Sequence, residues 1–162
     1  MPHTTPRSSS HARPRLAGVR SLILPLLAIG GLVAVMAFSR GGGGGLAPTP
    51  AYFDKALTLA SANDKSTASG KPVFVFVTAD WCPPCQALKR DALADPKVAE
   101  AVSTLTVPLY VDATNTVPDD VASLGISGFP TVILLQDGKQ LGRFTGNTSA
   151  SNVLAFVEQA RK

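Results

Sequence analysis

Two cysteines, Cys82 and Cys85, are the residues whose type and spacing most directly predict chemistry. They are the only cysteines among 162 residues. They follow an apolar run that favours a β-strand, and a cysteine at the start of the next helix has a lowered pKa that makes its thiolate reactive. We therefore predict that Cys82 attacks a disulfide as nucleophile and that Cys85 resolves the mixed disulfide. A purely structural bridge is the alternative, and it is disfavoured because so short a loop constrains the unfolded chain little.

Histidine content and charge argue against other kinds of site. The only histidines, His3 and His11, lie in the N-terminal tail, so the cysteines lack the partners of a zinc site. Residues 1–40 hold five arginines and no acid, whereas residues 41–162 hold 10 basic and 11 acidic residues. The pI of about 9.3 therefore reflects the N-terminal segment, and the domain lacks a basic face for nucleic acid. We expect no metal, no nucleic-acid partner and no cofactor beyond the redox-active dithiol.

The first 50 residues predict a membrane tether. Residues 1–20 have the composition of a disordered, basic, cytoplasmic tail. Residues 21–39 carry no charge and, as a helix, span about 28 Å, close to the thickness of the bilayer core. Residues 40–50 are rich in glycine and proline and favour a linker.

The arginines on the N-terminal flank favour retention of that end in the cytoplasm. We expect a single-pass anchor in the inner (cytoplasmic) membrane, with residues 51–162 facing the periplasm or the cell exterior. Cleavage of a signal peptide followed by secretion is the alternative. The length of the apolar stretch favours the uncleaved anchor.

The rest of the chain predicts alternating helices and strands in the order αβαβαββα. This order is typical of an α/β fold with a central mixed sheet flanked by helices, and Pro108 indicates an edge strand or a bulge. In the first half of the domain we expect a helix at 51–63, a loop at 63–70, a strand at 72–77, a helix that starts at the cysteines and continues over 86–93, and a helix at 97–103 started by Asp95 and Pro96. In the second half we expect a strand at 105–111, a short helix at 118–124, strands at 131–135 and 139–145 joined by a turn at Asp137 and Gly138, and a last helix capped by Ser149 or Ser151.

Over residues 50–162 the chain resembles the thioredoxin superfamily. The resemblance rests on two motifs, Ala79-Asp80-Trp81-Cys82-Pro83-Pro84-Cys85 and Gly125-Ile126-Ser127-Gly128-Phe129-Pro130-Thr131. It implies a thioredoxin-like fold in which Pro130 is cis and faces the dithiol. It also implies supporting positions at Trp81, Pro83 and Pro84, and a groove for an extended substrate peptide lined by Gly128, Phe129 and Gly146.

Within the superfamily, the chain is similar to the C-terminal periplasmic domain of DsbD-type thiol:disulfide interchange proteins. This similarity rests on the Ala-Asp-Trp-Cys start, on Asp95-Pro96-Lys97-Val98 and on Val111-Asp112-Ala113-Thr114. It implies electron transfer between disulfides at the membrane surface. The implied partners are client proteins with disulfides or thiols, apocytochromes among them, and a separate membrane or soluble electron donor.

Two positions depart from the family pattern in a way that affects proton transfer. The family's buried acid, six residues before the first cysteine, is replaced by Phe76, and the lysine that accompanies it falls on Pro108. The usual proton acceptor for Cys85 is therefore missing. Asp80 could serve instead as the proton relay, and a solvated loop acid is its equally weighted alternative.

The residues between the cysteines are a further departure. Pro83 and Pro84 lack N–H groups and so remove two donors that could reach the Cys82 sulfur. We predict a less lowered thiolate pKa and a less oxidising couple than donors there would give.

Three functions compete. The favoured hypothesis is a membrane-tethered extracytoplasmic thiol:disulfide oxidoreductase of the protein-disulfide reductase type. A dithiol oxidase or isomerase is the second, disfavoured because oxidases of the superfamily usually carry a histidine between the cysteines and a helical insertion. A non-enzymatic redox-responsive binding module or metallochaperone is the third, disfavoured because the domain contains no histidine.

Overall fold

The computed structural model describes residues 45–161. Residues Leu46–Lys162 form one compact unit. The predicted tail at 1–20, the apolar stretch at 21–39 and the start of the predicted linker lie outside the described residues. Within the described part of the chain, no helix is both long and apolar enough to cross a membrane.

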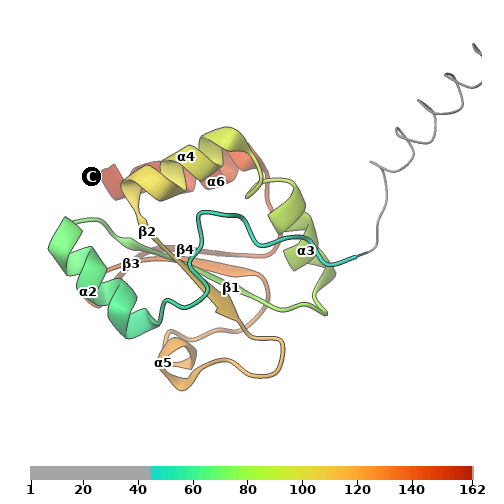
Figure 1. The fold of residues 1–162 in the computed structure, drawn as a ribbon, viewed down its shortest axis with the longest axis horizontal. Helices are drawn as coiled ribbons and strands as arrows, with labels where there is room; N and C mark the ends of the chain where they lie inside the picture. The colour runs from blue at the N-terminus through green and yellow to red at the C-terminus, as the bar shows by residue number, and fades with distance from the viewer. Residues whose placement is uncertain (1–44, 162) are drawn as a thin grey trace, which may run out of the picture. The chain divides into compact units, whose positions relative to one another are not determined.

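A mixed sheet of four strands lies at the centre (Figure 1). The strand order is β2-β1-β3-β4. Strand β1 pairs in parallel with β2 and antiparallel with β3, and β3 pairs antiparallel with β4. The strands are β1 Val73–Thr78, β2 Val107–Asp112, β3 Thr131–Gln136 and β4 Lys139–Thr145. The predicted α/β architecture is confirmed, and β2, which contains Pro108, is an edge strand as predicted.

Helices cover both faces of the sheet (Figure 1). They are α2 Leu59–Ser69, α3 Pro83–Arg90, α4 Pro96–Leu105, α5 Asp119–Ala122, α6 Ala150–Glu158 and the 3₁₀ turn η1 Gln159–Arg161. Helices α3, α4 and α6 share one core with the phenylalanines of β1, and α2 and α5 share a second core with its valines. Alternate residues of a strand face opposite sides of the sheet, so the buried residues of β1 contribute to both cores. This packing on both faces holds in position the strand that leads to Cys82.

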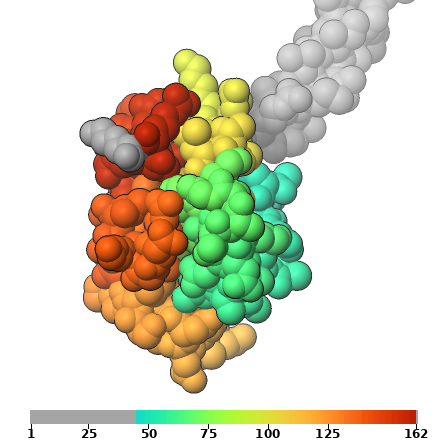
Figure 2. Space-filling view, turned by 90° about the vertical axis from the view of Figure 1, so that its left-hand side faces the viewer, coloured from blue at the N-terminus to red at the C-terminus, as the bar shows by residue number. Residues whose placement is uncertain are grey.

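The first helix was predicted in the wrong place. Residues 51–57 form turns, and α2 begins at Leu59 and runs through most of the segment 63–70 that was predicted as a loop. Thr58 caps this helix in a reciprocal box with Ser61. The pattern was misleading because the buried face of α2 consists of a leucine, an alanine and a serine. Figure 2 shows α2 in green between the cyan N-terminal segment and the orange β3–β4 hairpin.

The region after β1 also differs from the predicted order. Two helices, α3 and α4, separate β1 from β2. They correspond to the two helices expected at 86–93 and 97–103, which the order αβαβαββα counted as one. The break is explained by Asp95 and Pro96, which start α4 as the sequence indicated: the Asp95 carboxylate accepts hydrogen bonds from two backbone N–H groups of the first turn. Helix α3 begins at Pro83, directly after Cys82, which confirms the expected cysteine at the start of the helix, and it ends at Arg90 instead of residue 93.

The C-terminal elements follow the prediction closely. Asp137 and Gly138 both have positive φ, 50° and 73°, and join β3 to β4. Ser149 caps α6 by accepting a hydrogen bond from the Asn152 N–H.

Candidate active site

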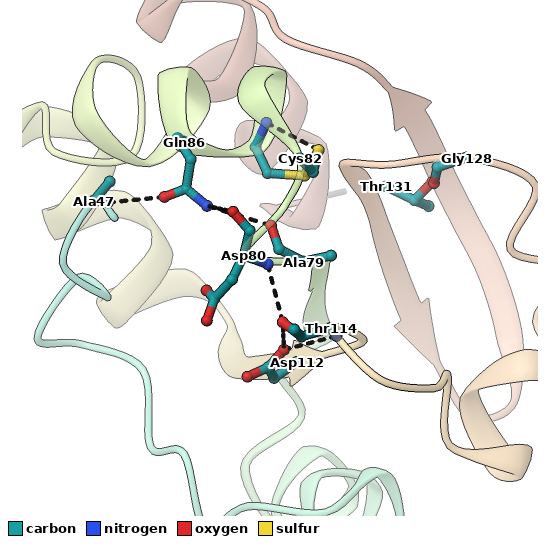
Figure 3. Close-up of a disulfide and its surroundings, with 10 residues drawn as sticks. Ala47, Ala79, Asp80, Cys82, Gln86, Asp112, Thr114, Gly128 and Thr131 are labelled. Carbon is teal, nitrogen blue, oxygen red and sulfur yellow. Dashed lines mark hydrogen bonds between the residues drawn. A yellow bond between two sulfur atoms is a disulfide. The ribbon is translucent and has the colours of Figure 1, made fainter. Parts of the chain in front are cut away.

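Cys82 and Cys85 form a disulfide at the start of α3, with their Cα atoms 5.3 Å apart (Figure 3). Cys82 is the N-cap residue of the helix, and Cys85 lies within its first turn. Cys82 is 3% exposed and Cys85 has no exposed surface. Of the two cysteines, only Cys82 therefore offers any surface to an incoming thiol or disulfide.

Hydrogen bonding to the Cys82 sulfur is limited by Pro84 alone, which corrects the expectation that both prolines remove a donor. The Cys85 N–H donates to Cys82 Sγ at 3.2 Å. A side chain at the N-cap can accept from the second and third helical N–H groups. Pro83 and Pro84 occupy the first and second positions and have no N–H. The sulfur thus keeps one of two capping donors, together with the favourable dipole at the helix start.

A loop containing a cis proline lies against the disulfide. The Phe129–Pro130 peptide bond is cis, which confirms what the resemblance to the thioredoxin superfamily implied. Phe129 packs against the small buried cluster that contains both cysteines. Its ring lies 5.5 Å from that of Trp81 in an edge-on arrangement, and Trp81 is 61% exposed. The structure therefore places an aromatic pair, one member of it open to solvent, beside the cysteines.

The two glycines expected in the groove are both attached to this loop. The Gly128 carbonyl accepts a hydrogen bond from Thr131 Oγ1 at 2.7 Å. Gly146 has a φ of 94°, a conformation that favours glycine, and its N–H donates to the Pro130 carbonyl at 2.8 Å. A Cβ added at Gly146 would meet no atom within 4 Å. Gly146 thus supports the proline loop through its backbone and leaves open space next to it.

Asp80 lies two residues before Cys82 in the sequence, but its carboxylate points away from the disulfide in Figure 3. Its backbone N–H donates to Thr114 Oγ1 at 2.9 Å. Burial lowers the pKa of Lys89, and the carboxylates of Asp80 and Asp112 partly oppose this effect. The Asp80 carboxylate therefore acts electrostatically on Lys89. A role for Asp80 in proton transfer from Cys85 stays a prediction.

The family's buried acid has no ionisable replacement at its own position. Phe76 is fully buried, and its ring lies 5.8 Å from that of Phe53 and 5.8 Å from that of Tyr110. Pro108 is half-buried in β2. Aromatic packing thus surrounds the side chain at the position where the family carries its buried acid.

Three polar residues near the site were missed by the sequence reasoning: Gln86, Lys89 and Thr114. Gln86 and Lys89 are 7% and 2% exposed. The Thr114 carbonyl accepts a hydrogen bond from Trp81 Nε1 at 2.8 Å, and its hydroxyl holds the backbone of Asp80. The only available signal was spacing, because Lys89 lies four residues after Cys85 and therefore on the same face of α3.

Comparisons with known proteins agree with the cysteine pair and the cis-proline loop described above. The model of the thioredoxin-like domain family matches residues 59–161. The thiol:disulfide interchange protein DsbD of Actinobacillus pleuropneumoniae is 31% identical over 114 residues, which cover 66% of this chain and 19% of that protein. Thioredoxin Y2, chloroplastic, of Arabidopsis thaliana is 32% identical over 114 residues, which cover 70% of this chain and 66% of that protein.

A solved structure agrees with these sequence matches. The reduced C-terminal domain of Neisseria meningitidis DsbD is 28% identical, with a TM-score of 0.56, and the match covers 67% of this chain and 99% of that one. The chain spans only about a fifth of the length of the DsbD relatives, 19% and 20% in two of them.

Proposed function

The chain belongs to the thioredoxin-like domain family, and from this premise we propose that it is a membrane-tethered thiol:disulfide oxidoreductase that reduces the disulfides of client proteins. The observation that carries the proposal is the Cys82–Cys85 disulfide at the start of α3, next to the cis-proline loop. A dithiol in this position can exchange with a client disulfide without a further cofactor.

The reaction follows from the different exposure of the two cysteines. In the reduced protein, the Cys82 thiolate attacks one sulfur of a client disulfide, and the other client sulfur leaves as a thiolate. Cys85, as thiolate, then attacks Cys82 Sγ, closes the intramolecular disulfide and releases the second client thiolate. Two electrons pass to the client, which takes up two protons, and a separate dithiol donor must reduce the Cys82–Cys85 disulfide again.

The direction of electron flow is supported by the hydrogen bonding of the nucleophile. A strong oxidant stabilises its reduced form through a very acidic nucleophilic thiol. Here one N–H donates to Cys82 Sγ, and Pro84 at the second helical position supplies none. The limited stabilisation of the thiolate favours a reducing couple.

The proposed clients meet the protein beside Phe129. Phe129 packs against the buried cluster that contains both cysteines, and the exposed ring of Trp81 offers apolar contact. An extended client segment could pair with the backbone of residues 128–130 in the manner of an added strand. The proposed partners are therefore proteins with accessible cysteines or disulfides.

The proposed tether rests on the sequence before the domain. Residues 21–39 carry no charge, and four arginines precede them. This pattern supports a single-pass anchor with the domain on the extracytoplasmic side. Extraction of membranes at alkaline pH tests the anchor: an integral protein stays in the pellet, and release into the supernatant contradicts the tether.

Trapping of the mixed disulfide tests the proposed reaction. The Cys85→Ser variant, reduced and mixed with oxidised insulin, should accumulate a covalent adduct that dithiothreitol reverses, because the resolving thiol is absent. Cys82→Ser should form none, and the wild-type chain should reduce insulin with turnover when dithiothreitol is supplied. Equal adduct formation by both variants would contradict the assigned roles.

A further inference from the structure

A single buried amide, that of Gln86, connects three backbone groups from two distant parts of the chain (Figure 3). Its Oε1 accepts a hydrogen bond from the Ala47 N–H at 2.8 Å. Its Nε2 donates to the Ala79 carbonyl at 3.3 Å and to the Asp80 carbonyl at 3.1 Å. Gln86 follows Cys85 directly in α3 and is 7% exposed.

The hydrogen bonds to residues 79 and 80 reach the nucleophile in one further step. The Ala79 carbonyl also accepts the N–H of Cys82, at 3.2 Å. The turn from Ala79 to Cys82 sets where the Cys82 side chain enters the helix N-terminus. The Gln86 side chain and the Cys82 N–H therefore donate to the same carbonyl, that of Ala79.

The other end of this connection lies in the segment before the first helix. Ala47 is 6% exposed, although it precedes every helix and strand of the domain. Its neighbour Pro48 and the nearby Pro50 have no N–H. These prolines cannot donate, and the hydrogen bond from the Ala47 N–H to Gln86 Oε1 attaches this stretch of backbone to helix α3.

A glutamine side chain can make both kinds of hydrogen bond found here, accepting from Ala47 and donating to residues 79 and 80. A carboxamide donates and accepts at once, whereas a lysine cannot accept and a carboxylate cannot donate. A buried amide that lost one of these partners would keep an unsatisfied polar atom at a cost in free energy. The bonds on the two sides of Gln86 are therefore expected to support each other.

We propose that Gln86 is a positioning residue that couples attachment of the N-terminal segment at Ala47 to the reactivity of Cys82. The proposal rests on the proposed thiol chemistry of this site. Loss of the attachment loosens Gln86, which then holds the turn from Ala79 to Cys82 less firmly. Cys82 Sγ moves away from the Cys85 N–H, the thiolate loses its hydrogen bond, and the pKa of the thiol rises.

The test compares three single variants of the full-length chain. Gln86→Ala removes both sides of the connection. Ala47→Pro removes the N–H that binds Gln86 and leaves the Gln86 side chain itself unchanged. Gln136→Ala is the matched control, because Gln136 Nε2 also donates to a backbone carbonyl, that of Gly70 at 3.2 Å, in a different part of the domain.

The measurement is the rate of iodoacetamide alkylation of Cys82 against pH, in a Cys85→Ser background that leaves one thiol. Gln86→Ala and Ala47→Pro are each expected to raise the thiol pKa by about one unit, which lowers the thiolate fraction below that pKa about tenfold. Gln136→Ala should match the parent. The double variant should resemble Gln86→Ala alone, because the two changes act through one connection.

Hydrogen exchange supplies a second readout that a general loss of stability would not reproduce. The Ala47 amide should exchange faster in Gln86→Ala than in Gln136→Ala. An unchanged pKa in Ala47→Pro, or strictly additive shifts in the double variant, would overturn the coupling. Ala47→Pro leaves Gln86 in place and decides the matter even if Gln86→Ala fails to fold.

Failure of the proposed function is distinguishable from failure of this coupling. If the wild-type chain does not reduce insulin but Ala47→Pro still shifts the pKa, the reductase assignment is wrong and the coupling stands. If the wild-type chain reduces insulin and neither variant shifts the pKa, the coupling is wrong and the assignment stands.

Discussion

Replacing Pro84 with alanine is expected to lower the pKa of the Cys82 thiol and to make the disulfide more oxidising. Pro84 stands at the second position of α3, where an N–H could reach the N-cap side chain. Helix α4 of the same chain shows the effect of such a donor. There, proline occupies only the first position, and Asp95 accepts from the N–H groups of Lys97 and Val98 at 2.8 and 3.3 Å.

The size of the effect follows from the hydrogen bond that is added. A hydrogen bond to a charged group contributes about 1.5–3 kcal/mol, and one pKa unit corresponds to about 1.4 kcal/mol. Because sulfur is a weak acceptor, we take the lower end and expect a decrease of about one unit. The reduced form is stabilised by the same amount, which raises the two-electron reduction potential by about 30 mV.

Pro83→Ala is the matched control for this prediction. It makes the same chemical change one residue earlier, at the first helical position, whose N–H is not a capping donor. The pKa is measured from the pH dependence of alkylation and the potential from equilibrium with glutathione. Equal shifts in the two variants, or no shift in Pro84→Ala, would refute the idea that a missing capping donor sets the reactivity of Cys82.

Three further substitutions test other parts of the structure. Burial lowers the pKa of Lys89, so this residue contributes a rise of the unfolding free energy with pH just below pH 10.5. Burial also raises the pKa of Tyr52 and Tyr110, which act in the opposite direction at alkaline pH. In urea unfolding, Lys89→Met should therefore make the slope of stability against pH more negative than in the wild type, and parallel profiles would contradict the assignment. The hydrogen bond from the Thr114 hydroxyl is the main cause of the lowered pKa of Asp112. Ionised Asp112 therefore stabilises the fold above about pH 3.9, and this stabilisation is lost as pH falls through the folded-state pKa. Thr114→Val should weaken this loss of stability in acid, and an unchanged unfolding profile between pH 2 and 7 would contradict the assignment. A Cβ at Gly142 would lie 2.9 Å from Phe156 Cε2, so Gly142→Ala should destabilise the fold by about 1–3 kcal/mol in urea unfolding, and stability equal to the wild type would show that the ring can move aside.

The parts of the molecule that follow from local pattern were predictable from the sequence. The continuous apolar run before Cys82 predicted a buried central strand, and Asp95, Asp137 and Ser149 predicted two helix starts and a turn that the structure contains. Each of these signals acts within a few residues. The second motif, with Pro130, could be interpreted only through its resemblance to a family.

The parts that depend on distant contacts were not predictable. Gln86 meets Ala47 across 39 positions of sequence, and nothing in either neighbourhood distinguishes a buried amide from a solvated one. Lys89 is buried although lysine is usually exposed. Helix α2 was misplaced because its buried positions include Ala62 and Ser66, which contribute little to an apolar stripe.

The reduction potential of the full-length chain, measured at equilibrium with glutathione, tests the proposed reductase function most directly. Because a single N–H donates to the Cys82 sulfur, we predict a potential near that of thioredoxin, about −270 mV, or below. A value near −120 mV, typical of a strong dithiol oxidant, would contradict it.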